Sequence, residues 1–272
     1  MSNHRVSRLT INGVGLDCRW VGPGPGQAPT MVLLHEGLGS AQQWGTWPES
    51  LAEATGCGVF LYSRAGYGTS DPIALPRRLD YLEDEAVRVL PQVLAAVGFE
   101  RGILLGHSDG ASIATCYLGR VGDHRVRGLI LLAPHFYVEP VGLQGVEAAR
   151  VAFETGDLRT WLAKHHGANV DLAFWGWNNA WLDPAFQSWD IREAIGFVRV
   201  PILIVQGTAD PYGTTAQIDA ALAEAYCPVE TVLLEGVGHA PHLERHRETL
   251  EAVARFTMTL MTTLGEGGRH GR

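Results

Sequence analysis

The sequence predicts an α/β fold built on a mostly parallel sheet. Short, continuous apolar segments of strand character alternate with helical segments along most of the 272 residues. Strands of this kind are typical of a parallel sheet that helices cover on both faces. A hairpin signal comes before the alternation, and a long helical stretch interrupts it. With 46% hydrophobic residues, the chain is able to bury a large core.

The first predicted element is a β-hairpin. Residues 6–11 and 14–21 flank Asn12-Gly13, the strongest short signal for a hairpin turn. The segment that follows, Gly22-Pro-Gly-Pro-Gly26, is predicted to be a linker. Its glycines resemble a phosphate loop, but its two prolines have no N–H to donate and a strand rather than a helix comes next.

The alternation of strands and helices then continues to the end of the chain. The predicted strands are residues 30–34, 58–62, 101–105, 126–132, 201–205 and 231–234. The predicted helices are residues 44–54, 81–97, 112–118, 215–225 and 243–264. The interruption contains five of the eight tryptophans: Trp161, Trp175, Trp177, Trp181 and Trp189. We therefore expect a helical cap (136–198) over a core domain made of residues 1–135 and 199–272.

Composition narrows the class of protein. A net charge of −8 argues against nucleic acid or an anionic membrane as a partner. The sequence has no apolar run of 18 residues and no signal-peptide pattern at its start. The four cysteines are scattered without metal-ligand spacing and are expected to be reduced core thiols. We expect a cytoplasmic protein that acts on a small molecule, with a homodimer left open.

The most informative motif is Gly106-His-Ser-Asp-Gly110. The pattern G-x-S-x-G between a strand and a helix is the nucleophile elbow. Small residues must flank the serine because the turn is sharp, and the hydroxyl of Ser108 then stands clear of the backbone. The serine also lies at a helix N-terminus, where free N–H groups favour developing negative charge. Ser108 is therefore the predicted nucleophile, in preference to a simple helix N-cap.

A serine needs a base, and the base needs an orienting group. Asp210 follows the strand at 201–205, and His239 follows the strand at 231–234. Both lie at the carboxyl ends of strands, the edge where active groups collect in such sheets. We expect His239 to act as general base and then acid, and Asp210 to fix the tautomer of its imidazole.

The tetrahedral intermediate also needs hydrogen-bond donors for its oxyanion. One donor is expected to be the backbone N–H of Asp109, which follows the nucleophile. The other is expected from the loop at 35–40, where glycines let the backbone approach the substrate closely. Gly37 is the predicted donor in that loop.

With these motifs in place, the chain resembles the α/β-hydrolase superfamily, in its small, capped branch of carboxylesterases and C–C hydrolases. The motifs are H-E-G-L-G-S (35–40), S-R-A-G-Y-G-T-S-D (63–71), G-H-S-D-G (106–110), Q-G-T-A-D (206–210) and G-H-A-P-H-L-E (238–244). The resemblance implies an eight-stranded sheet, a cap between strands six and seven, a Ser–Asp–His triad and no cofactor. Relatives usually have a second glycine where Glu36 stands.

Two carboxylates near the nucleophile allow more than one interpretation. The side chain of Asp109 either pairs with a cationic group on the substrate, such as the α-amine of an amino-acid ester, or is a first-turn acid favoured by the helix dipole, a contribution of about 0.3–1 kcal/mol. Glu36 either enlarges an acidic substrate pocket or pairs with Arg64 as part of the scaffold, and we favour the second.

Other candidate residues lie in the predicted cap and beside the nucleophile. Trp175, Trp177 and Trp181 are candidates for an apolar substrate pocket, although their close spacing prevents all three from facing one way. His165-His166 has no third ligand at helical spacing, so no metal is expected. His107 is expected to pack behind the elbow.

The leading prediction is a serine hydrolase that cleaves a small ester, thioester or lactone through an acyl-enzyme on Ser108. Hydrolysis of a carbon–carbon bond in a meta-cleavage-type diketone uses the same triad and is the enzymatic alternative. A non-catalytic small-molecule-binding protein on the same scaffold is the alternative from another class. Epoxide hydrolases and dehalogenases need an aspartate nucleophile, and Ser108 argues against them.

Overall fold

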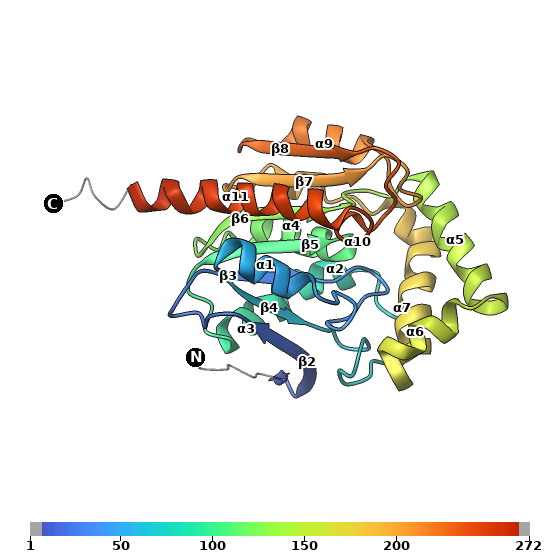
Figure 1. Ribbon diagram of the computed structural model, residues 1–272. Helices are drawn as coiled ribbons and strands as arrows, with labels where there is room; N and C mark the ends of the chain where they lie inside the picture. Colours follow the sequence, from blue (N-terminus) through green and yellow to red (C-terminus); the bar gives the residue numbers. More distant parts are fainter. Residues whose placement is uncertain (1–6, 267–272) are drawn as a thin grey trace.

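Eight strands form one sheet in the order β1-β2-β4-β3-β5-β6-β7-β8 (Figure 1). The computed structural model describes residues 7–266. The strands are β1 (Arg8–Ile11), β2 (Val14–Val21), β3 (Thr30–Leu34), β4 (Gly58–Tyr62), β5 (Gly102–His107), β6 (Val126–Leu132), β7 (Ile202–Gly207) and β8 (Val229–Leu234). The β1–β2 and β2–β4 pairs are antiparallel, and all other pairs are parallel. The predicted mostly parallel sheet is confirmed.

The predicted hairpin is present. Ile11 pairs with Val14, and both turn residues are left-handed, with φ of +53° at Asn12 and +80° at Gly13. This is the type I′ geometry that matches the twist of the strands it joins. The first predicted strand included Val6, which lies outside the described residues.

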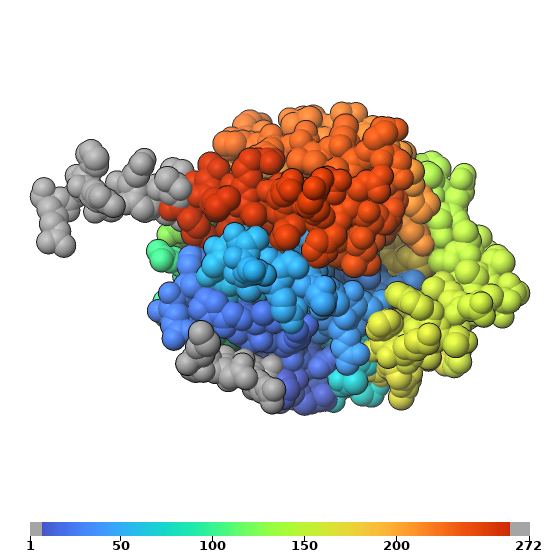
Figure 2. All heavy atoms as spheres, in the orientation of Figure 1, coloured from blue at the N-terminus to red at the C-terminus, as the bar shows by residue number. Residues whose placement is uncertain are grey.

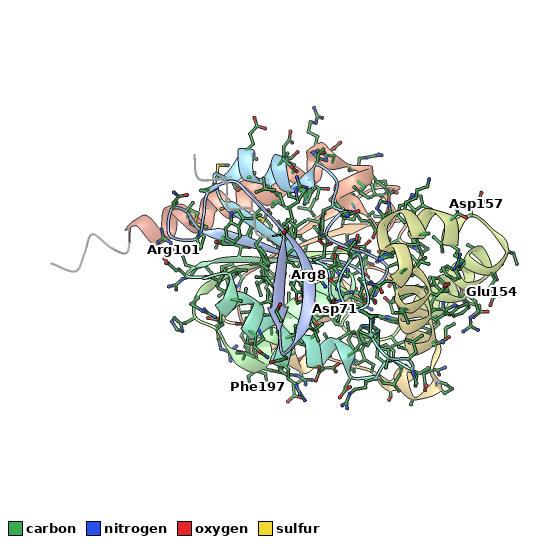
Figure 3. All side chains as sticks on the ribbon, turned by 90° about the horizontal axis from the view of Figure 1, so that it is seen from below. Arg8, Asp71, Arg101, Glu154, Asp157 and Phe197 are labelled. Atoms are coloured by element: carbon green, nitrogen blue, oxygen red, sulfur yellow. The ribbon has the colours of Figure 1, made fainter. Side chains whose placement is uncertain are left out.

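The hairpin is tied to the loop after β4 by Asp71. Its carboxylate pairs with the guanidinium of Arg8, as Figure 3 shows, and accepts a hydrogen bond from the backbone N–H of Gly15 at 2.5 Å. The pair is largely exposed, and exposed ion pairs contribute about 0–1 kcal/mol. Asp71 therefore fixes the position of the hairpin more than it stabilises the fold.

Helices cover both faces of the sheet. One face carries α1 (Trp47–Thr55) and α11 (His246–Glu266), which lie side by side across the front of Figure 2. The other face carries α2 (Tyr81–Asp84), η1 (Glu85–Val89), α3 (Leu90–Ala96), α4 (Asp109–Val121), α8 (Arg192–Ile195) and α9 (Ala216–Glu224). The short α10 (Pro241–Glu244) precedes α11. The predicted two-sided covering is confirmed.

The side chains of the strands alternate between the two helical layers. Along β3, Met31 and Leu33 pack in the layer of α1 and α11, whereas Val32 and Leu34 pack in the other layer. All five residues of this strand are buried. A parallel strand buried on both faces has no polar side to reveal its period, which explains its continuous apolar sequence.

The predicted helix at 81–97 is interrupted by a π-turn. The N–H of Leu90 bonds to the carbonyl of Glu85, five residues earlier, and Pro91 has no N–H to continue an α-helical ladder. Glu85 is partly buried in this turn and accepts a hydrogen bond from the hydroxyl of Tyr62 at 2.7 Å. The prediction placed the helical segment correctly but missed this change of period.

Three long helices come between β6 and β7 in the chain, and they lie beyond the carboxyl ends of the strands (Figure 1). They are α5 (Pro140–Thr155), α6 (Leu158–His166) and α7 (Val170–Leu182), followed by η3 (Pro184–Ser188). The imidazole of His166 accepts from the N–H of Gly68 at 2.9 Å and donates to the carbonyl of Leu38 at 2.9 Å. These helices therefore rest directly on two loops of the core, as the contact of the yellow and blue segments in Figure 2 also shows.

The domain boundaries stay a prediction. The last helix of the stretch 136–198, α8, packs against α4 and α9 of the core.

Three of the four cysteines are buried, whereas Cys227 is partly exposed. Among residues 7–266, no helix combines the length and apolar character needed to cross a bilayer.

Candidate active site

Ser108 lies in a sharp turn between β5 and α4. Its backbone has φ of +53° and ψ of −116°, a strained conformation that non-glycine residues adopt mainly at functional sites. A Cβ atom at Gly106 would lie 2.2 Å from the carbonyl oxygen of Gly110. The turn therefore excludes a side chain at residue 106 and lifts the hydroxyl of Ser108 to the end of the sheet.

Asp210 and His239 meet at the same end of the sheet. The Nδ1 atom of His239 lies 2.8 and 2.9 Å from the two carboxylate oxygens of Asp210. The carboxylate also accepts hydrogen bonds from the amide of Gln206 at 2.9 Å and the N–H of Tyr212 at 2.8 Å. Burial acts to raise the pKa of Asp210, but the hydrogen bond and charge of His239 lower that pKa to about 2. Asp210 is therefore ionised at neutral pH.

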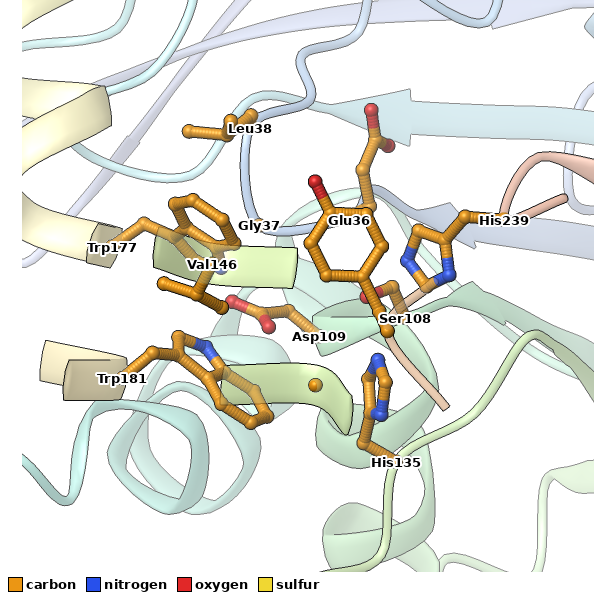
Figure 4. A pocket seen from close by; sticks show the side chains of 12 residues that line it. Glu36, Gly37, Leu38, Ser108, Asp109, His135, Val146, Trp177, Trp181 and His239 are labelled. Atoms are coloured by element: carbon orange, nitrogen blue, oxygen red, sulfur yellow. The ribbon is translucent and has the colours of Figure 1, made fainter. Parts of the chain in front are cut away.

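Ser108 and His239 line one cavity of about 90 Å³. Figure 4 shows the imidazole of His239 beside the side chain of Ser108. The remaining lining residues are Glu36, Gly37, Leu38, Asp109, His135, Gly142, Val146, Trp177, Trp181 and Tyr212. Because Asp210 binds Nδ1, the Nε2 atom of His239 is left to face Ser108. The structure thus brings together the three predicted triad residues.

The predicted oxyanion donors also reach this cavity. Gly37 and Asp109 both line it, and within residues 7–266 no hydrogen bond from either backbone N–H is present. A Cβ atom on Gly37 would lie 2.2 Å from Nε1 of Trp177. Only glycine at this position lets the tryptophan of α7 approach the loop so closely.

The carboxylate of Asp109 is fully buried at the wall of the cavity. Its Oδ2 atom accepts a hydrogen bond from the hydroxyl of Tyr81 at 2.6 Å, and that hydroxyl accepts one from Nε1 of Trp181 at 3.1 Å. Arg64 lies 3.9 Å from the same oxygen. Burial raises the pKa of Asp109, although Arg64 and Tyr81 act in the opposite direction.

The second oxygen of Asp109, Oδ1, has no hydrogen-bond partner in the described part of the chain. Figure 4 shows the carboxylate between the rings of Trp177 and Trp181. A buried acceptor without a partner loses its hydration and gains nothing in return, at a cost of about 1–3 kcal/mol. This oxygen is therefore ready to accept a hydrogen bond from a bound molecule.

The predicted ion pair between Glu36 and Arg64 is wrong. The guanidinium of Arg64 donates to the backbone carbonyls of His35 at 2.5 Å and Glu36 at 2.9 Å. The carboxylate of Glu36 lies instead 3.4 Å from Nδ1 of His107. The tight loop after β3 turns the side chain of Glu36 toward the elbow strand while its carbonyl faces Arg64.

His107 packs behind the elbow, in the position expected from the sequence. It is buried, and its Nε2 atom lies 2.7 Å from the backbone carbonyl of His239. Burial acts to lower the pKa of His107, but the nearby carboxylate of Glu36 raises that pKa above its ordinary value. Glu36 and His107 together support the backbone that carries the candidate base.

Two of the three candidate tryptophans line the cavity. Trp177 and Trp181 are four residues apart on α7 and therefore share a face of the helix. Trp175 does not reach the cavity, and its ring packs against Phe153 and Phe174, with centroids 5.5 and 5.0 Å apart. Its selection as a substrate-binding residue was wrong, because two residues along a helix turn the side chain by about 200°.

Sequence reasoning missed two polar lining residues, His135 and Tyr212. His135 follows β6, and Tyr212 stands two residues after Asp210, with its ring 4.7 Å from that of His239. Both lie on loops at the carboxyl ends of strands, and that position was an available signal. Val146 and Gly142 come from α5, and no local signal pointed to them.

Comparison with known proteins places the chain among hydrolases of one fold. The model of the "Alpha/beta hydrolase family" matches residues 31–252. Over 114 residues the chain is 32% identical to a proline iminopeptidase of Lactobacillus delbrueckii subsp. bulgaricus, covering 42% of this chain and 38% of the relative. Over 129 residues it is 29% identical to epoxide hydrolase 3 of Xenopus tropicalis, covering 47% and 34%.

These two matches span little more than a third of each relative's length. Among solved structures, an esterase from Rhodococcus sp. ECU1013 superposes with a TM-score of 0.70 at 21% identity, covering 93% of this chain and 98% of that one. At this identity the likeness shows the fold alone.

Proposed function

The chain belongs to the α/β-hydrolase family, and we propose that it is a serine hydrolase of small esters, thioesters or lactones. One observation carries the proposal. The strained Ser108 and His239 line one cavity, and Asp210 is hydrogen-bonded to His239, although more than 100 residues separate serine from aspartate in the chain. This is the arrangement that turns a hydroxyl into a nucleophile.

In the proposed mechanism, Nε2 of His239 takes the proton of Ser108 as Oγ attacks the carbonyl carbon. The C=O electron pair moves onto oxygen, and the backbone N–H groups of Gly37 and Asp109 stabilise that oxyanion. His239 then gives its proton to the leaving oxygen or sulfur, and the acyl-enzyme remains. Water completes the reaction by the same transfers, and Asp210 keeps the Nδ1 proton in place throughout.

The size and lining of the cavity favour a small acyl group. The cavity of about 90 Å³ is small, and Trp177, Trp181 and Val146 give it apolar walls. Such sites use a few polar groups to fix orientation. Asp109 is placed to be one of them.

We further propose that Asp109 selects acyl groups that carry an amine. Its free Oδ1 oxygen is a buried acceptor at the cavity wall, and an ammonium group of the substrate supplies both a donor and a compensating charge. Because Arg64 already offsets part of the charge of Asp109, most of the gain comes from the hydrogen bond.

Asp109→Asn is expected to lower kcat/KM for an alanyl p-nitrophenyl ester about 10- to 100-fold more than for the isobutyryl ester. A charge-assisted hydrogen bond contributes about 1.5–3 kcal/mol, and the two acyl groups differ only by ammonium against methyl. The variant keeps the backbone N–H of residue 109, so the oxyanion donor is unchanged. Equal losses on both esters would reduce Asp109 to a helix-start residue.

Labelling with a fluorophosphonate tests the proposed function itself. We expect one covalent adduct on Ser108, located by peptide mass spectrometry, together with hydrolysis of small p-nitrophenyl esters. The Ser108→Ala variant serves as the control that takes up no label. A folded protein with neither an adduct nor ester turnover would instead be a binding protein on a hydrolase scaffold.

A further inference from the structure

His135 occupies a position in the cavity that the proposed mechanism does not use. It follows β6, lines the cavity, and is only 5% exposed. Its ring centroid lies 5.5 Å from that of His239. In Figure 4 a nitrogen of the His135 ring points toward Ser108. The nucleophile therefore lies beside two imidazoles, of which the triad uses one.

The fold fixes the backbone at His135. Ala133 has a φ of +45°, a left-handed conformation that turns the chain sharply after β6. Along this backbone, the hydroxyl of Ser112 donates to the carbonyl of His135 at 2.6 Å, and the N–H of Phe136 donates to the side chain of Gln217 at 2.8 Å. The backbone that carries the ring is thus held in place by hydrogen bonds to α4 and α9.

The ring of His135 lacks a hydrogen-bond partner within residues 7–266, where only its backbone carbonyl accepts one. Its neighbours are aromatic rings and backbone. The centroids of the His135 and Trp181 rings lie 5.4 Å apart, and a Cβ atom on Gly213 would lie 3.3 Å from Nδ1 of His135. Buried polar side chains normally have partners. An imidazole that faces the nucleophile without one is therefore suited to bind a molecule in the cavity.

His135 is unsuited to act as a second base. Burial, together with the charge of the neighbouring His239, lowers the pKa of His135 to about 3. The carboxylate of Asp210 acts in the opposite direction but does not overcome burial. The ring is therefore neutral throughout the working pH range, and a neutral imidazole has one nitrogen that accepts a hydrogen bond without taking the proton.

We propose that His135 positions the water that hydrolyses the acyl-enzyme, an inference that rests on the proposed function. Once the leaving group has departed, a water molecule between the two imidazoles donates one hydrogen to Nε2 of His239 and the other to His135. Its lone pair then faces the acyl carbon on Ser108. The bond from water oxygen to carbon forms and the bond from carbon to Oγ breaks. The proton passes through His239 to Ser108, and His135 gains none.

The test separates deacylation from acylation. The acyl-enzyme is formed with a p-nitrophenyl ester, excess ester is removed, and decay of the acylated mass is followed by intact-protein mass spectrometry. His135→Phe is expected to slow this decay about 10- to 100-fold. The first burst of p-nitrophenol, which reports acylation, is expected to change less than threefold, so that kcat and KM fall together.

His135→Gln retains an acceptor and is expected to recover part of the decay rate. His124→Phe, an exposed histidine before β6, makes the same change elsewhere and is expected to match the wild type. Unchanged decay in both His135 variants, or equal slowing of burst and decay, would overturn the role of His135. If His135→Phe does not fold, the glutamine variant decides on the same criteria. Failure of the wild type to form an acyl-enzyme would overturn the proposed function instead.

Discussion

Ser108→Ala is expected to lower kcat by about 10⁵- to 10⁶-fold and to leave substrate affinity nearly unchanged. The substitution removes one oxygen from the cavity and leaves its walls, the two oxyanion donors and the pair of Asp210 and His239 in place. No alkoxide then forms, and the substrate is attacked only by water. The measurement is single-turnover hydrolysis of a p-nitrophenyl ester, with substrate affinity determined separately by fluorescence quenching of Trp177 and Trp181.

Alanine tolerates the strained backbone at this position as well as serine does, because the two residues share the same Cβ. The melting temperature of the variant is therefore expected to stay close to that of the wild type, and a loss of activity reports chemistry. Turnover within a hundredfold of the wild type would mean that His239 activates water directly. Ser108 would then have no role as nucleophile.

The centre of the candidate site is largely predictable from the sequence because its signals are local. The sharp turn at Ser108 requires Gly106 two residues earlier, and this leaves a recognisable pattern in the chain. Asp210 and His239 each stand a few residues after an apolar strand, and parallel strands deliver such residues to one edge of the sheet. Local sequence patterns therefore predict the three residues at the ends of their strands, and the topology of the sheet brings these residues together.

The walls of the cavity are less predictable, because they depend on how separate layers pack. Trp175 and Trp177 look equivalent in the sequence, but the contact of α7 with Phe153 selects which of them faces inward. Glu36 stands beside the partner expected for it and turns to His107 instead. Such choices are made by side chains from distant segments, which a single sequence does not place.

His135 is a further residue whose role in the cavity wall depends on distant segments. Its position after β6 was visible in the sequence, but its value as a lining residue depends on the turn at Ala133 and on the ring of Trp181. The π-turn at Glu85 also involves a distant segment, because the carboxylate of Glu85 accepts a hydrogen bond from Tyr62 on β4. Local propensity predicted a helix there and had no information about its period.

Asp210→Asn is expected to lower kcat by about 10⁴-fold at neutral pH. The carboxylate of Asp210 accepts hydrogen bonds from His239, Gln206 and Tyr212, and both of its oxygens are engaged. An asparagine amide in either orientation turns its NH₂ group toward one of these donors. Where it meets Nδ1 of His239, the imidazole shifts to the tautomer with hydrogen on Nε2, which cannot accept the proton of Ser108.

The same substitution has a predicted signature in stability. Because the pKa of Asp210 falls from an ordinary 3.8 to about 2 on folding, its ionised form contributes about 2 kcal/mol above pH 4. This contribution is lost as the pH falls from 4 toward 2, since the unfolded chain binds the proton first. In Asp210→Asn, this part of the acid dependence of the unfolding free energy is expected to disappear.

Asp123→Asn provides the matched control for both effects. The pKa of Asp123 is also lowered to about 2: burial acts against this shift, but the hydrogen bonds from Arg125 and Tyr117 outweigh it. Asp123 precedes β6 and therefore lies at the amino ends of the parallel strands, whereas Ser108 lies at their carboxyl ends. Its variant is expected to lose a similar acid dependence and to keep its kcat, since the carboxylate is remote from the imidazole. If Asp210→Asn instead retained kcat within tenfold of the wild type, the tautomer of His239 would have to be fixed by another group, and the triad would be reduced to a dyad.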